Sequence, residues 1–234
     1  MVYVMADLHG EIERFEDIMN QIQLTETDTL YILGDVIDRS PNGIKILLQI
    51  MRTPNIKMLL GNHEDMMLNA LYRPIEIKNK WVNEEWIRAK LIEAWYENGG
   101  QATHNYLKRI RKDLRQKIFE YLETLPVNVE IKVNGQEFIL THAALIENYK
   151  VVNYRYKNEK EFAIWDRHAH KEYVPDGKIL VFGHTPTSRH QSDKPYKVWK
   201  YKDRIGIDCG CGYSQDGRLG CLRLDDMKEY YSQK

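Results

Sequence analysis

Residues 29–64 read TLYILGDVIDRSPNGIKILLQIMRTPNIKMLLGNHE, and this stretch decides the fold class. Two apolar runs, residues 29–33 and 56–60, predict buried strands, and residues 44–51 between them predict a helix. Each apolar run ends in a polar loop, GDVIDRSPNG after the first and GNHE after the second. Strand, loop, helix and strand make up the unit from which parallel sheets with helical crossovers are built.

The residues before this stretch repeat the same order. Residues 2–6 (VYVMA) predict another short strand, DLHG predicts a loop, and apolar residues then recur at helical spacing from Ile12 to Ile22. The first seventy residues therefore predict three strands of one parallel sheet, and the fold class is α/β.

The rest of the chain changes character. Residues 74–125 are helical in pattern, are interrupted at ENGGQ (97–101), and predict a helical insertion. Asn134-Gly135 between alternating residues predicts a hairpin, and Asp216-Gly217 predicts a second hairpin tip. No linker or repeat divides the chain, so we expect a single domain over residues 1–234.

Composition excludes several classes of protein. Thirty-four basic residues balance thirty-four acidic ones, which gives no indication of a nucleic-acid or membrane partner. No apolar run approaches the roughly 20 residues of a membrane span, and the N-terminal residues do not resemble a signal peptide. Three crowded cysteines, Cys209, Cys211 and Cys221, argue against a disulfide framework. We therefore expect a cytoplasmic protein.

Polar loops follow five predicted strands, and each offers a carboxylate, an imidazole or an amide. They are ADLHG with Asp7 and His9, GDVIDRS with Asp35, Asp38 and Arg39, GNHE with Asn62 and His63, THAA with His142, and FGHT with His184. Binding sites of open α/β sheets form at such strand ends. One such residue alone is ordinarily a turn former, but five groups together would bury unpaired charge unless a cation were present. This mixed nitrogen and oxygen set suits Mn, Fe or Zn better than Ca or a cysteine-type zinc site.

These motifs resemble the signature set of the phosphoprotein phosphatase branch of the calcineurin-like metallophosphoesterases. DLHG, GDVIDRS, GNHE, HAA and GHT occur in the family's order between residues 7 and 185. WYENGGQATHNYL (95–107) resembles a stretch of bacterial members, and IDCGCGYSQDGRLGCLRLDD (207–226) resembles the family's closing strand pair. The resemblance implies a bacterial or phage-type serine/threonine protein phosphatase, with an α-β-β-α sandwich of two mixed sheets flanked by helices.

The resemblance also implies a ligand set for two divalent metal ions, with manganese preferred and iron or zinc as alternatives. The ligands would be Asp7 and His9 for the first ion, Asp35 as the bridge, and Asn62, His142 and His184 for the second. The amide of Asn62 would ligate without adding negative charge.

A second group of residues would act on the substrate. The resemblance implies that a metal-bridging hydroxide attacks phosphorus and that His63, oriented by Asp38, protonates the leaving oxygen. Arg39 and Arg167 of IWDRH would bind the phosphate oxygens together with Asn62 and His63. The alternative for Arg167 is a surface cation beside Asp166.

Three functions remain open at this point. The first is hydrolysis of phosphomonoesters of proteins, on Ser/Thr or Tyr, or of small phosphoesters. The second is a dinucleoside tetraphosphate hydrolase, whose branch shares the metal site but tends to lack the equivalent of Asp38. The third is an inactive binding module, which would have lost a ligand or the acid. Two departures from the family pattern, Ser40 and Ala144, remove no ligand.

The aromatic residues of the insertion leave one question open. Trp81, Trp86, Trp95 and Tyr96 could line a substrate groove, or they could form the core of the helices themselves, which is the commoner arrangement.

Overall fold

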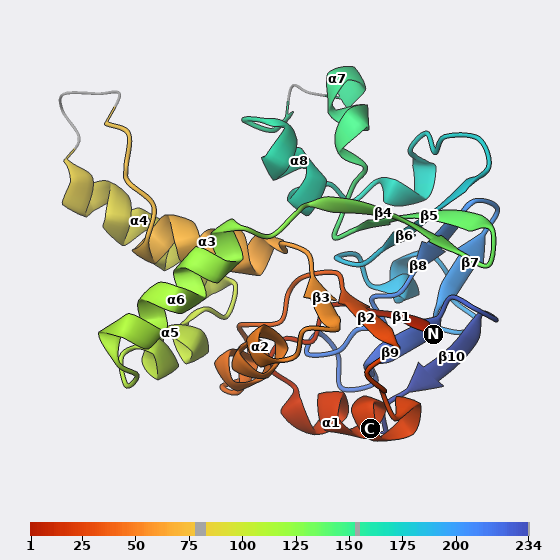
Figure 1. Cartoon of the computed structure of the whole chain (residues 1–234). Coiled ribbons are helices and arrows are strands. Elements are labelled where there is room, and N and C mark those ends of the chain that lie inside the picture. Colours follow the sequence, from red (N-terminus) through yellow and green to blue (C-terminus); the bar gives the residue numbers. More distant parts are fainter. Residues whose placement is uncertain (78–82, 153–154, 234) are drawn as a thin grey trace.

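The strands form two five-stranded mixed sheets in a computed structural model that describes residues 1–77, 83–152 and 155–233 (Figure 1). The first sheet has the order β10-β9-β1-β2-β3 and the second the order β4-β5-β6-β8-β7. In the first sheet the strands are β1 Val2–Met5, β2 Thr29–Ile32, β3 Ile56–Met58, β9 Gly220–Arg223 and β10 Lys228–Tyr231. In the second they are β4 Asn128–Val133, β5 Gln136–Thr141, β6 Lys178–Phe182, β7 Trp199–Tyr201 and β8 Arg204–Gly206.

The parallel core predicted from residues 2–60 is confirmed. β1 pairs in parallel with β2, and β2 with β3. The crossovers contain the helices α1 Ile12–Ile22 and α2 Gly43–Arg52, which lie together against one face of the first sheet (Figure 1). Antiparallel β9 and β10 complete that sheet beside β1, and β5, β6 and β8 form a second parallel group.

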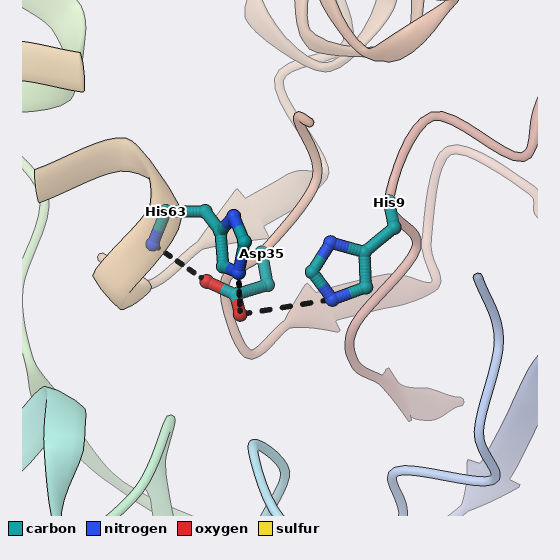
Figure 2. A group of neighbouring side chains, drawn as sticks. All are labelled: His9, Asp35 and His63. Atoms are coloured by element: carbon teal, nitrogen blue, oxygen red, sulfur yellow. Dashed lines mark hydrogen bonds and ion pairs between the residues drawn. The ribbon is translucent and has the colours of Figure 1, made fainter. Parts of the chain in front are cut away.

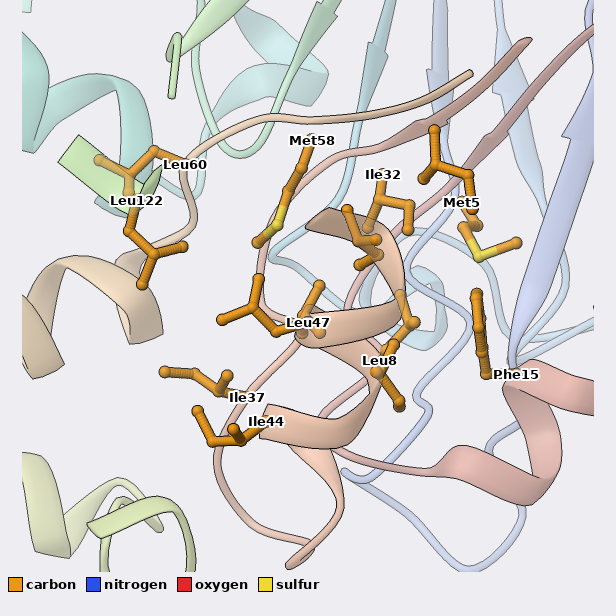
Figure 3. Packing of buried hydrophobic residues seen from close by; sticks show 14 of the residues in the cluster. Met5, Leu8, Phe15, Ile32, Ile37, Ile44, Leu47, Met58, Leu60 and Leu122 are labelled. Carbon is orange, nitrogen blue, oxygen red and sulfur yellow. The ribbon is translucent and has the colours of Figure 1, made fainter. Parts of the chain in front are cut away.

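The alternation of side chains along β1 explains the layering. Tyr3 and Met5 pack on the side of α1 and α2, while Val4 and Ala6 pack toward the second sheet. Figure 3 shows the first of these cores, in which Met5, Ile32 and Met58 of the strands face Leu47 and Phe15 of the helices.

The face of the second sheet turned away from the first is covered too. Ile139, Leu180 and Phe182 of that face pack against Ala169 and Val174. Ala169 belongs to the short 3-10 helix η3 Ala169–Lys171. Buried side chains thus separate successive layers, in agreement with the predicted sandwich of two mixed sheets with flanking helices.

One hairpin prediction is confirmed and one is wrong. Asn134 and Gly135 connect β4 to β5 with φ values of 49° and 88°, as a two-residue turn with positive φ at both positions requires. Asp216-Gly217 is not the tip of a hairpin of paired strands, because β9 pairs antiparallel with β1 and β10, and the turn that connects β9 to β10 lies at residues 224–227. Asp216-Gly217 lies instead in a longer turn that ends at a single bridge between Gly210 and Arg218.

The predicted helical insertion corresponds to three helices, α4 Glu84–Glu97, α5 Gln101–Leu107 and α6 Lys112–Glu123. They gather with α3 Asn62–Leu71 on one side of the sandwich (Figure 1). Trp95 is fully buried and Trp86 is exposed, so these two aromatics do not share one environment. Residues 78–82, which include Trp81, lie outside the described residues.

The remaining described helices are short. They are η1 Ile146–Asn148, α7 Tyr149–Val152, α8 Glu159–Trp165 and η4 Thr187–Arg189. Within the described ranges, no helix has the combination of length and apolar character that a membrane crossing needs.

Candidate metal centre and acid pair

The strand-end loops converge on one hollow of about 200 Å³. The predicted site residues that line it are Asp7, His9, Asp35, Arg39, Asn62, His63, Arg167 and His184. The two remaining predicted residues, Asp38 and His142, are buried beneath the surface of the hollow. Residues from the five strand-end motifs and Arg167 from the segment after α8 therefore meet, although up to 177 positions separate them in the chain, as between His184 and Asp7.

Asp35 lies at the centre of this group (Figure 2). Its Oδ2 is 3.8 Å from His9 Nε2, 3.8 Å from His63 Nε2 and 3.5 Å from His142 Nε2. Its Oδ1 accepts a hydrogen bond from the backbone N–H of His63 at 3.0 Å. Two sets of potential ligand atoms share this carboxylate, one with His9 and His63 and the other with His142 and His184.

Three imidazoles are each held through one ring nitrogen by a backbone carbonyl. His9 Nδ1 contacts the carbonyl of Ile37 at 3.2 Å and His142 Nδ1 that of Leu33 at 2.6 Å, and His184 Nε2 contacts a third carbonyl, of Trp165. A ring N–H donated to a carbonyl leaves the other ring nitrogen free to ligate a metal. Burial lowers the pKa of all three histidines, well below the ordinary value for His9 and His184, and so favours the neutral ligand form.

The contact between His142 and Asn62 tests whether these residues fit a cation. His142 Nε2 lies 2.9 Å from Asn62 Oδ1. Because Nδ1 is engaged with Leu33, the neutral ring presents a lone pair to the amide oxygen, which is also an acceptor. Two facing acceptors are the arrangement that a shared cation satisfies, so the donor set fits a divalent metal.

Buried carboxylates support the same conclusion. Asp7 accepts a hydrogen bond from the backbone N–H of His184 at 2.9 Å. Burial raises its pKa well above the ordinary value, and the neighbouring Asp208 and Asp35 raise it further. Asp208, which the sequence did not single out, lines the same hollow, and burial raises its pKa to about 6. Three buried carboxylates around one hollow are stabilised by a cation.

His63 differs from the other three imidazoles. Its Nδ1 donates to Asp38 Oδ2 at 2.8 Å, so that Nε2 is the nitrogen that faces the hollow. Burial lowers its pKa, but the charge of Asp35 and the hydrogen bond to Asp38 outweigh that effect and hold the pKa above its ordinary value. His63 is thus the imidazole of the group that stays protonated most readily.

Glu64, the last residue of GNHE, braces the loop after β2. It is fully buried, and its carboxylate accepts hydrogen bonds from the backbone N–H groups of Asp35, Val36, Ile37 and Gly61 at 2.9 to 3.2 Å. Gly61 is required beside it, because a Cβ at this position would collide with Asp35 Oδ1.

The two predicted phosphate-binding arginines lie on the exposed side of the hollow. Arg39 Nη2 is 3.5 Å from His63 Nε2, and Arg167 Nη1 donates to the carbonyl of His184 at 2.9 Å. Within the described part of the chain neither forms an ion pair with a carboxylate. Both guanidinium groups are therefore available to an anion.

Left-handed backbone is concentrated in this site. Of the eleven non-glycine residues with positive φ among those described, six are site residues: Asp7, His9, Asp35, Asp38, Arg39 and His184. Strain of this kind persists where the surrounding contacts fix the backbone, and it is enriched at functional sites.

Several supporting residues escaped the sequence analysis. Glu64 and Trp95 stand inside quoted motifs, GNHE and WYENGG. Their partners in the loop after β2 are 27 to 57 positions away, so no local pattern predicts these supporting contacts. Asp208 follows β8 as the other acids follow their strands, and that repeated placement is the signal that could have identified it.

Comparison with known proteins gives a consistent result. The profile of the family described as calcineurin-like phosphoesterase matches residues 1–209. A symmetrical bis(5'-nucleosyl)-tetraphosphatase of Erwinia tasmaniensis is 33% identical over 75 residues, which are 31% of this chain and 27% of that protein. Serine/threonine-protein phosphatase 2 of Salmonella typhimurium is 23% identical over 169 residues, which are 71% of this chain and 67% of that protein.

A solved structure resembles the whole chain. The crystal structure of a putative diadenosine tetraphosphatase superposes with a TM-score of 0.61 at 18% identity, over 98% of this chain and 91% of that one. At this identity the likeness concerns the fold. The alignment with the Erwinia tetraphosphatase spans about a quarter of that protein's length.

Proposed function

The chain belongs to the calcineurin-like phosphoesterase family of metal-dependent phosphoester hydrolases, and from this premise we propose that it is a phosphatase acting on phosphomonoesters of proteins. The observation that carries the proposal is the contrast among the four imidazoles. The Nδ1 of His63 donates to the carboxylate of Asp38, whereas one ring nitrogen of His9, His142 and His184 contacts a backbone carbonyl. In agreement with these contacts, the pKa of His63 lies above its ordinary value, and burial lowers the pKa of the other three. Metal-assisted ester hydrolysis needs neutral imidazoles to bind the metal and a protonated group to donate a proton to the leaving oxygen.

We assign the metal ligands as two sets that share Asp35. Asp7 and His9 would hold one ion, and Asn62, His142 and His184 would hold the other. His63 lies as close to Asp35 as His9 does, but we assign it to proton transfer because its Nδ1 is engaged by Asp38. Divalent ions bound there would polarise phosphoryl oxygens and lower the pKa of a water molecule. Manganese fits this mixed donor set, as do iron and zinc.

The residues of the chain divide the remaining tasks. Arg39 and Arg167 bind the phosphate oxygens and orient the phosphorus toward the buried side of the hollow. His63 Nε2–H gives its proton to the leaving oxygen, and Asp38 holds the ring in the tautomer and orientation that this requires. The hollow of about 200 Å³ has room for a phosphoryl group and its nearest atoms, so the rest of the substrate would lie outside it.

Phosphoproteins are our first substrate class and dinucleoside tetraphosphates the second. The pair His63–Asp38, whose carboxylate the tetraphosphatase branch tends to lack, supports the first, as does the long alignment with the Salmonella phosphatase. The higher local identity to the Erwinia tetraphosphatase supports the second. Values of kcat/KM for phosphoserine, phosphothreonine and phosphotyrosine peptides, compared with diadenosine tetraphosphate in the presence of Mn²⁺, would distinguish the two classes.

We also propose that residues 1–234 form one domain, because the apolar cluster between the sheets contains side chains from both. In that domain the helices α4 to α6 would be an insertion rather than a separate unit.

The role of His63 is tested by the variant His63→Asn. We expect kcat on alkyl phosphates to fall on the order of a hundredfold to ten-thousandfold. The fall on p-nitrophenyl phosphate should be much smaller, because its leaving group needs little protonation. His168→Asn, at an exposed histidine, is the matched control and should change neither rate. An equal loss on both substrates would contradict the assignment of His63 as the acid, and wild-type protein inactive with every divalent ion would contradict the proposed function.

A further inference from the structure

The segment α4–α5 contributes none of the assigned metal ligands, yet it contacts the loop after β2 at three points. Trp95 Nε1 donates to Asp38 Oδ2 at 2.7 Å. The backbone N–H of Asp38 donates to Thr103 Oγ1 at 2.9 Å, and that of Arg39 donates to the carbonyl of Gly99 at 3.1 Å. These contacts all reach the two residues that serve His63 and the phosphate.

The carboxylate of Asp38 depends on few partners. It is completely buried, and its Oδ2 receives both the His63 Nδ1–H and the Trp95 Nε1–H. Its Oδ1 is buried and has no hydrogen-bond partner among the described residues. Two donors on one oxygen therefore determine how this carboxylate faces His63.

Trp95 is itself held tightly in place. Its ring is fully buried and lies 5.6 Å from that of His104. Gly100 lies against the indole so closely that a Cβ there would collide with its Nε1. The last glycine of the WYENGG motif thus leaves the space that the indole occupies, and Trp95 has little freedom to turn its N–H away from Asp38.

We propose that Trp95 is a positioning residue for the acid pair: its indole N–H fixes Asp38 Oδ2, and through it the orientation of the His63 ring toward the leaving oxygen. The inference rests on the proposed function, since it assigns Trp95 a task in the same reaction. It also gives the helical insertion a role in catalysis, because Trp95 and Thr103 both belong to it.

The consequence can be separated from a general loss of structure. A misplaced His63 fails to protonate a poor leaving group but matters little for a good one, whereas damage to the metal ligands or the fold lowers both rates. The ratio of kcat on an alkyl phosphate to kcat on p-nitrophenyl phosphate therefore reports on positioning. Because Trp95 does not line the hollow, KM should change little.

The test is Trp95→Phe, which removes the N–H and keeps an aromatic ring. We expect kcat on the alkyl phosphate to fall by about tenfold to a hundredfold, the range for a hydrogen bond to a charged group. The rate on p-nitrophenyl phosphate and the number of Mn²⁺ ions bound should stay within about twofold of wild type. Trp86→Phe, the same substitution at an exposed position of α4, is the matched control.

A second pair of variants tests the same proposal if the Trp95→Phe protein does not fold. Thr103→Val removes the acceptor for the Asp38 N–H, and Thr103→Ser keeps it. We expect the first to reduce the alkyl phosphate rate selectively and the second to preserve it.

The outcomes keep the two proposals distinct. If His63→Asn shows the selective loss and neither Trp95→Phe nor Thr103→Val does, the role of Trp95 is overturned and the proposed function stands. If His63→Asn itself shows no selectivity, the assignment of His63 as the acid fails and the role of Trp95 fails with it, whereas the proposed function fails only if the wild-type protein is inactive with every divalent ion. In the double variant His63→Asn/Trp95→Phe, we expect no further loss beyond His63→Asn, and an additive loss would mean that Trp95 acts elsewhere.

Discussion

The strand-end loops and the α4–α5 segment contribute to the site in opposite ways. The strand-end loops and the first residues of α3 carry every proposed metal ligand and the proposed acid. They are braced by carboxylates, the buried Glu64 under the loop after β2 and the partly buried Glu172 behind the loop after β5. The α4–α5 segment carries no such ligand and braces Asp38 with neutral groups, the indole of Trp95 and the hydroxyl of Thr103. The supports of Asp38 thus come from a different part of the chain than the acid that Asp38 orients.

The difference has a physical reason. Consecutive backbone N–H groups in a tight loop need several acceptors at once, and one carboxylate supplies them. A second carboxylate beside Asp38 could offer only acceptor oxygens, so a neutral donor such as the indole N–H is the suitable partner. The protonation of a carboxylate support changes with pH, whereas that of an indole or a hydroxyl support does not.

Removing the shared ligand is the strongest test of the loop region. We expect Asp35→Asn to lose activity on the order of a thousandfold or more, because the metals supply several kcal/mol of transition-state stabilisation. Titration calorimetry with Mn²⁺ should show affinity falling together with activity. Asp176→Asn, at an exposed aspartate, is the control. Unchanged Mn²⁺ affinity in Asp35→Asn would contradict the assignment of this carboxylate as the shared metal ligand.

Removal of the Glu64 carboxylate, which supports the loop after β2, should have the next largest effect. Glu64→Ala leaves four buried N–H groups without their acceptor, and we expect unfolding free energy to fall on the order of 3 to 5 kcal/mol. Urea denaturation of the metal-free protein measures it, with the exposed Glu85→Ala as control. A change within about 0.5 kcal/mol would show that the loop does not depend on Glu64.

The smallest expected effect concerns pH. Burial raises the pKa of Glu172 to about 7, and its carboxylate accepts from the Leu145 N–H and from Asn148 Nδ2, both at 3.1 Å. Because the folded pKa lies above the unfolded one, the folded protein binds the extra proton between about pH 4.5 and 7, and stability falls as pH rises through that window.

Comparison of wild type with Glu172→Gln isolates this carboxyl group, since contributions of other groups such as Glu64 cancel. We expect the difference in unfolding free energy between the two proteins to change by about 1 to 3 kcal/mol from pH 4.5 to pH 8, with wild type losing more. Parallel urea denaturation at the two pH values measures it. A difference independent of pH would mean that Glu172 keeps the same protonation state when the protein folds.

The same comparison explains what could be predicted from the sequence. Apolar runs that end in polar loops mark strand ends, so the parallel core and the meeting of residues such as Asp7 and Asp35 follow from local patterns and a general rule of α/β sheets. The supports do not follow, because Trp95 and Asp38 are 57 positions apart and only the packing of α4 brings them together. The Asp216-Gly217 hairpin failed for a related reason: a turn dipeptide indicates a turn, but strand pairing decides whether it is a hairpin tip.

The most direct test of the account is anomalous X-ray diffraction from crystals of the protein grown with Mn²⁺ and measured at the manganese edge. We predict two anomalous peaks in the hollow, both in contact with the carboxylate of Asp35, one beside His9 and the other beside His142 and His184. A hollow without peaks at saturating Mn²⁺, or peaks that leave Asp35 uncoordinated, would contradict it.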